Sequence, residues 1–147
     1  MTFSCYASVE GLSPQEGQGP GKIALVDFHY DITMPNDLGD GSITGLRRHG
    51  CFSLVHRLGA HSLAFTRAIC QNRELPKVTV RHYHTDPDNG ETSLVFTHEL
   101  HNAKIVAIQH GRDGTIELET VKLMFDEITF TDAAGDSFTD RWDVSGD

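Results

Sequence analysis

Apolar and polar residues alternate along the segment 119–130, and the alternation changes phase once within it. The apolar positions are the odd-numbered Val121, Leu123 and Phe125, followed by the even-numbered Ile128 and Phe130. Successive side chains of a strand point to opposite faces of a sheet, so one extra residue must be accommodated if a single face is to stay buried. The pattern therefore predicts a long strand with a bulge near residues 126–127.

Other stretches alternate in the same way and predict further strands. In the segment 24–34 every even-numbered residue is apolar, which predicts a strand with one buried face. Further strands are predicted over 3–9, over 48–57, from 78 onward, and over 94–100. Asp-Asn-Gly at 88–90 and Gly-Arg-Asp-Gly at 111–114 predict hairpin turns. The chain is therefore expected to be mainly β.

One stretch interrupts the strands and predicts a helix. Residues 63–70 are reasonable helix formers, Phe65 and Ile69 lie one turn apart, and Ser62 is a candidate N-cap. Pro76 is expected to stop the helix. The apolar stripe could bind a partner, but its spacing is more typical of a face that packs on the core. We therefore expect the helix to close one end of a barrel.

Length and charge limit the domain organisation and the class of partner. The 147 residues suit one domain, with a core over about 3–131 and an acidic tail over 132–147. Within that tail, Phe138 and Trp142 either belong to a loose segment or pack against a neighbour. A net charge of −9 opposes binding to nucleic acid or to an anionic membrane. Because the N-terminus has no basic start followed by an apolar run, and no run could span a bilayer, we expect synthesis as a cytoplasmic protein.

Nucleophilic catalysis finds little support in the sequence. Three cysteines, odd in number and widely spaced, favour reduced and largely buried thiols. Cys51 lies near His49 and His56 in the sequence, but no third group orients either imidazole. The glycine-rich runs lack the Gly-Lys-Ser/Thr ending of a phosphate loop. We therefore expect a protein that is not an enzyme, without catalytic residues or a cofactor.

Nine histidines are the main candidates for metal chemistry. His82 and His84 lie on one face of a predicted strand, and with Glu91 they could form the metal site of a small cupin-like metalloenzyme. If an Asn-Gly turn closes the hairpin, Glu91 lies opposite His84, whereas His98 pairs near Lys77, roughly 23 Å from His84. This register excludes His98 from a shared ligand set. Surface imidazoles and no metal are the favoured interpretation, and the metalloenzyme is the alternative from another class.

The segment 36–45 is rich in Gly and Asp and predicts a long loop, and long loops in small domains are often functional. The predicted strands also raise the question of what covers their unpaired edges. Closure of several copies into a ring is one way to satisfy every edge, although the pattern does not require it.

Three stretches of the sequence, taken together, resemble one known family. The pattern Glu-x-Val-x-Leu-x-Phe-x-x-Ile-x-Phe over 119–130 resembles the last strand of the hemolysin-coregulated proteins (Hcp), the tube subunits of bacterial type VI secretion systems. Residues 100–106 resemble the family's preceding strand, and 63–70 lies where the family has its helix. The resemblance implies two antiparallel sheets forming a β-barrel or sandwich with one short flanking α-helix.

The resemblance also implies a structural function. Hcp-like proteins assemble as homohexameric rings and stack into a tube that a contracting sheath expels from the cell without a signal peptide. The lumen of this tube can carry effectors. The implied partners are further copies of the chain, the sheath, spike and baseplate proteins, and secreted effectors. A tail-tube protein of a phage or another contractile injection particle is the nearest alternative.

By position, the loop 35–47 corresponds to the family's extended loop, which reaches toward the neighbouring ring. The ring-stacking residues implied by this resemblance are Pro35, Leu38, Ile43 and Leu46. The alternative is a mobile, partly disordered surface loop, since Gly and Asp dominate it.

Overall fold

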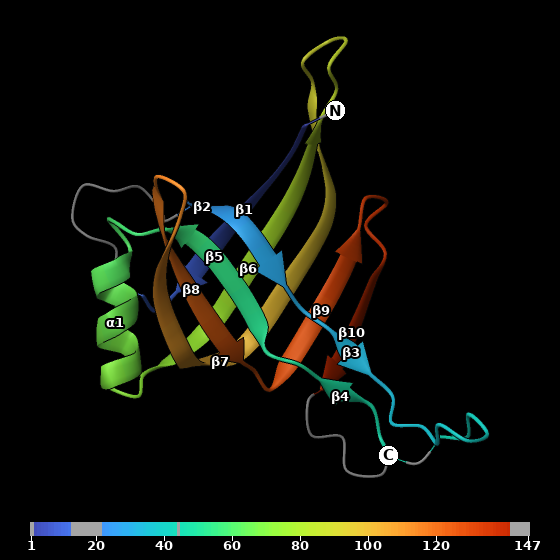
Figure 1. Cartoon of the computed structure of the whole chain (residues 1–147). Coiled ribbons are helices and arrows are strands. Elements are labelled where there is room, and N and C mark those ends of the chain that lie inside the picture. The colour runs from blue at the N-terminus through green and yellow to red at the C-terminus, as the bar shows by residue number, and fades with distance from the viewer. Residues whose placement is uncertain (1, 13–21, 44, 142–147) are drawn as a thin grey trace.

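The computed structural model describes residues 2–12, 22–43 and 45–141 (Figure 1). Ten strands and one helix follow one another along these residues. They are β1 (Thr2–Glu10), β2 (Lys22–His29), β3 (Ile32–Thr33), β4 (Arg48–His49), β5 (Phe52–Arg57), α1 (Ser62–Cys70), β6 (Glu74–Thr85), β7 (Thr92–Asp113), β8 (Ile116–Met124), β9 (Glu127–Asp132) and β10 (Ser137–Arg141). No described helix is long and apolar enough to cross a bilayer.

Six antiparallel strands close into a barrel in the order β7-β6-β1-β2-β5-β8, with β8 returning to β7. The 22-residue strand β7 makes this closure possible. One side of β7 pairs with β6, and the other side pairs with β9 over residues 96–101 and with β8 over 104–113. The predicted β-barrel with a flanking helix is confirmed. Because the barrel strands pair with one another, ring formation is not needed to satisfy their edges.

The phase change predicted near 126–127 is present, but it separates two strands rather than bulging one. Val121, Leu123 and Phe125 are buried, and Ile128 continues the buried face in the other phase. β8 ends at Met124 and β9 begins at Glu127, so the outer partner changes from β5 to β10. The peptide N–H of Asp126 donates to the carbonyl of His101 at 3.1 Å, which keeps β9 on the same side of β7.

The predicted strand 24–34 is also divided, and the prediction that its even positions are buried is wrong: Tyr30 is half-buried, and the other five are exposed. Ile23 is buried and Leu25 packs partly on the core, whereas Val26 is exposed. The register with β5 shifts between Leu25 and Asp27, and this irregularity brings Phe28 inward, against Phe52. The short sheet of β3 and β4 then follows, outside the barrel.

The predicted helix forms, with different ends. Ser62 is its first residue rather than its N-cap, and the Ser62 hydroxyl accepts a hydrogen bond from the N–H of Gly59 at 3.0 Å. The helix ends at Cys70, and Asn72 turns the chain with φ of 51°. Pro76 therefore does not stop the helix but lies within β6. The helix packs on the core through Phe65 and Ala68, and it flanks the barrel in Figure 1.

Part of the predicted acidic tail is an ordered strand. Residues 137–141 form β10, which pairs with β9 so that Phe138 lies opposite Phe130. Trp142 and most of the predicted loop 11–21 lie outside the described residues. The hairpin of β9 and β10 stands beside the barrel and next to the small sheet of β3 and β4 (Figure 1).

Candidate assembly surfaces

The loop between β3 and β4 projects from the body of the molecule (Figure 1). Its described part is held together by its own hydrogen bonds: Asp37 N–H to Ser42 O and Gly41 N–H to Asp37 O, both at 2.7 Å. An isolated bridge joins Asn36 to Ile43. The Asp40 carboxylate accepts the N–H of Ser42, and this hydrogen bond lowers the pKa of Asp40. The loop is thus a small hairpin rather than an extended segment.

Apolar side chains of this loop face outward. Leu38 is 99% exposed, Ile43 62% and Leu46 55%, whereas Pro35 is half-buried. Met34 and Ile32 extend the exposed apolar surface toward β3. Apolar surface gathered on one projecting element is typical of a site that contacts another molecule. Of the four predicted stacking residues, the structure exposes three and leaves Pro35 nearer the stem.

A buried polar network joins the stem of the loop to β10. The Asp140 carboxylate accepts two hydrogen bonds from Arg47, each at 2.5 Å, and one from His49 Nε2 at 2.8 Å. His49 Nδ1 lies 2.6 Å from the hydroxyl of Tyr30. The hydrogen bonds from Arg47 hold the pKa of Asp140 down at about 2, while burial raises the pKa of Tyr30. The sequence analysis missed this network, because Asp140 follows Arg47 and His49 by more than ninety residues.

His82 and His98 are in direct contact, which corrects the predicted register. His98 pairs with Val80 rather than with a residue near Lys77, and its Nδ1 lies 2.9 Å from His82 Nε2. The predicted pairing of His98 near Lys77 is therefore wrong, and His98 contacts His82, one of the histidines of the alternative metal site. Burial, together with the smaller effect of the nearby His82, lowers the pKa of His98 to about 4. The ring of His98 packs against the rings of Phe52 and Phe96, with centroid distances of 5.1 and 5.0 Å.

The structure does not bring the proposed metal ligands together. His84 pairs with Ser93, and its ring packs on Phe3, while Glu91 lies across the turn from Asp86. Glu91 is thus two positions further along the hairpin than predicted. Among the described residues there is no group of three or more His, Cys, Asp or Glu side chains that could hold a metal ion.

A second buried polar cluster crosses three barrel strands. Glu119 is 0% exposed, and its two carboxylate oxygens each lie 2.7 Å from an imidazole, Nε2 of His56 on β5 and Nε2 of His110 on β7. The pKa of Glu119 is lowered, because the hydrogen bonds from the two imidazoles outweigh the cost of burying the charge. His49 and His56 thus each lie within hydrogen-bond distance of a carboxylate. The thiol of Cys51 instead lies 3.3 Å from the sulfur of Met124.

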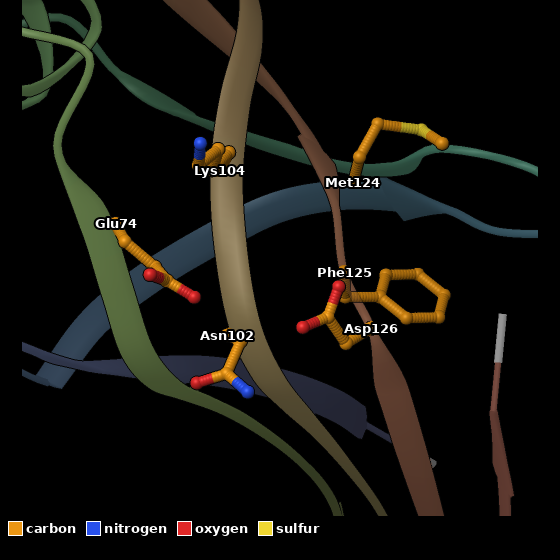
Figure 2. A pocket seen from close by; sticks show the side chains of 6 residues that line it. All are labelled: Glu74, Asn102, Lys104, Met124, Phe125 and Asp126. Carbon is orange, nitrogen blue, oxygen red and sulfur yellow. The ribbon is translucent and has the colours of Figure 1, made fainter. Parts of the chain in front are cut away.

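A cavity of about 360 Å³ lies where β7 bends and β8 ends (Figure 2). It is lined by Glu74, Asn102, Lys104, Met124, Phe125 and Asp126. Asn102 adopts φ of 54°, a left-handed conformation that non-glycine residues rarely take within a strand. Two carboxylates and one ammonium group line the opening (Figure 2), so its formal charge is −1 and does not favour an anion.

Comparison with known proteins identifies the family. A model described as type VI secretion system effector, Hcp, matches residues 3–131. Solved structures share the fold: an Hcp protein is 22% identical with a TM-score of 0.84, covering 95% of this chain and 99% of that one. Hcp1 from E. coli EAEC 042 is 23% identical with a TM-score of 0.79, covering 95% and 97%. Hcp3, a secreted protein from Pseudomonas aeruginosa, is 21% identical with a TM-score of 0.77, covering 96% and 99%.

A comparison with curated proteins gave no match. The family model nevertheless spans most of the chain, and nothing in these findings favours a phage tail tube or a cupin-like enzyme. Hcp proteins are secreted and assemble into tubes. The chain therefore belongs to the Hcp family and is a tube subunit of a type VI secretion system.

Proposed function

We propose that six copies of this chain close into a ring and that rings stack into the tube through the loop 35–47, with Leu38, Ile43 and Leu46 as the contacting side chains. The observation that carries the proposal is the exposure of these three side chains on an element that projects from the barrel. Pro35, at the half-buried stem, supports the loop without itself making the contact.

The energetics favour a contact made many times over. Fully burying a Leu or Ile side chain stabilises an interface by roughly 1.5–3 kcal/mol. One loop therefore contributes only a few kcal/mol, which ordering of the loop and repulsion between subunits partly offset. Six loops of one ring acting together would bind the next ring much more tightly than one loop, because every contact after the first is effectively intramolecular.

The net charge of −9 per chain opposes stacking. Rings of like charge repel one another, and salt screens that repulsion over about 8–10 Å at physiological ionic strength. Apolar contacts at the loop tips provide the attraction that charge cannot. In the secretion apparatus, we propose that the tube meets sheath, spike and baseplate proteins, carries effectors in its lumen and leaves the cell when the sheath contracts.

The test is the double variant Leu38→Asp with Ile43→Asp. Light scattering should give a mass near six chains for both wild type and variant, while negative-stain micrographs should show long tubes only for the wild type. Leu63→Asp is the control, since Leu63 is a similarly exposed apolar residue on α1, on the other side of the barrel (Figure 1). Tubes of unchanged length in the double variant would refute the stacking role of the loop.

A further inference from the structure

We infer that Asp140 is a positioning residue for stacking: by holding Arg47 and His49 at the stem of the loop, the C-terminal hairpin fixes the direction in which Leu38 is presented. The inference rests on the proposed stacking role of the loop. It gives the hairpin of β9 and β10, which lies outside the closed barrel, a part in assembly.

The contact has the geometry of a strong ion pair. Arg47 donates from Nε to one oxygen of Asp140 and from Nη2 to the other, so the pair is bidentate. Side chains of the pair are 31% and 12% exposed, and that of His49 is fully buried. Bidentate Arg–carboxylate pairs fix orientation as well as distance, because both groups are planar. Arg47 therefore cannot swing away from β10 without losing both hydrogen bonds.

The network also reaches the other limb of the loop. Since the pKa of Asp140 is held down at about 2, the carboxylate is ionised and can only accept hydrogen bonds. Nε2 of His49 therefore donates to the carboxylate, and Nδ1 of the same ring lies 2.6 Å from the hydroxyl of Tyr30. Tyr30 precedes β3, whereas Arg47 and His49 follow the loop. One carboxylate thus ties together the outgoing and returning limbs.

The rings of Tyr30 and His49 also pack on Phe125, but among the described residues the backbone of the stem makes few hydrogen bonds. β3 and β4 form a ladder of only two residue pairs, Ile32 with His49 and Thr33 with Arg48. One further backbone hydrogen bond, from Gly50 N–H to Asp31 O at 2.8 Å, lies next to it. A two-stranded ladder of this length is not stable by itself in water. Without Asp140, we expect the loop to sample many directions, so that fewer loops on a ring would point at the next ring at once.

The test uses Asp140→Asn, with Asp136→Asn as its matched control. Both substitutions replace an aspartate by asparagine and so remove one negative charge. Asp136 is exposed on the same hairpin, and no described contact joins its side chain to Arg47 or His49. In D140N, amide hydrogen exchange over residues 35–43 should accelerate about tenfold or more, as loss of a charge-assisted hydrogen bond implies. The ring mass should be unchanged, and the protein concentration needed to form tubes should rise at least tenfold. D136N should match the wild type in all three measurements.

A second pair of variants keeps the inference testable if D140N folds poorly. Arg47→Gln removes the bidentate partner from the partly exposed side, and Arg48→Gln is the control at the adjacent exposed position. R47Q should accelerate loop exchange and shorten tubes, while R48Q should do neither. Nitrogen NMR of the wild type should show a proton on Nε2 of His49.

The failures of the two proposals are distinguishable. If the Leu38 and Ile43 double variant still forms long tubes, the stacking role itself is wrong. If that variant loses tubes while folded D140N and R47Q keep wild-type loop exchange and tube length, the stacking role stands and the positioning role of Asp140 is overturned.

Discussion

His98 is held neutral by its surroundings, so lowering the pH is expected to weaken the folded subunit well before its carboxylates are protonated. The side chain is 8% exposed, and burial brings its pKa to about 4 from an ordinary value of 6.5. Between these two values the unfolded chain binds a proton that the folded chain does not. The contribution of His98 to the free energy of unfolding is therefore fully present above pH 6.5, and it is lost as the pH falls toward 4.

The size of the effect follows from the two pKa values. A tenfold change in proton affinity corresponds to about 1.4 kcal/mol, so between pH 7 and pH 5 His98 alone should remove about 2 kcal/mol of unfolding free energy. His82 and His61 act in the same direction, since burial lowers the pKa of each. The pKa values of Glu119 and Asp140 are lowered too, but both groups titrate below this window.

The assay is urea unfolding at pH 7 and pH 5, at one fixed protein concentration because assembly stabilises the subunit. His98→Asn keeps a polar group near the position of Nδ1, facing His82, and removes the titration. It should reduce the loss of stability between the two pH values by about 2 kcal/mol. His101→Asn is the control, since His101 lies on the other face of the same strand, beside Glu99. An unchanged pH dependence in His98→Asn would refute the reasoning.

Three further substitutions test the packing and the buried charge by urea unfolding. Phe65→Ala should cost about 3–5 kcal/mol, because the ring is fully buried against the barrel, and a cost under about 1 kcal/mol would contradict that packing. Glu119→Gln should cost about 1–3 kcal/mol, because its amide cannot accept from both imidazoles, whereas the exposed Glu117→Gln should change stability by less than about 0.5 kcal/mol. Asn102→Gly should be neutral or slightly stabilising while Asn102→Ala costs about 1 kcal/mol, since φ is 54°; equal effects would refute strain at this position.

The sequence predicted those features of the fold that repeat with a short period. The phase change between Phe125 and Ile128 was visible, because each half of the segment alternates clearly. The break in β2 was not, because Ile23 and Leu25 are apolar as well as the even positions around them, so alternation alone could not say which set is buried.

Register and long-range pairing were beyond local patterns. The turn after β6 spans more residues than an Asn-Gly turn, and a further irregularity lies between His82 and Tyr83, so the predicted partner of His98 was wrong. Asp140 was one of several acidic residues in a predicted tail, and nothing near it in the sequence indicates Arg47 as its partner. Such pairs are set by how the elements pack together.

The closed barrel, sealed by β7, separates folding from assembly. Each chain can satisfy its own barrel hydrogen bonds, so folding is a first-order event within one molecule, whereas ring and tube formation depend on subunit concentration. Dilution of the tube after delivery should therefore release intact, folded subunits rather than unfolded chains.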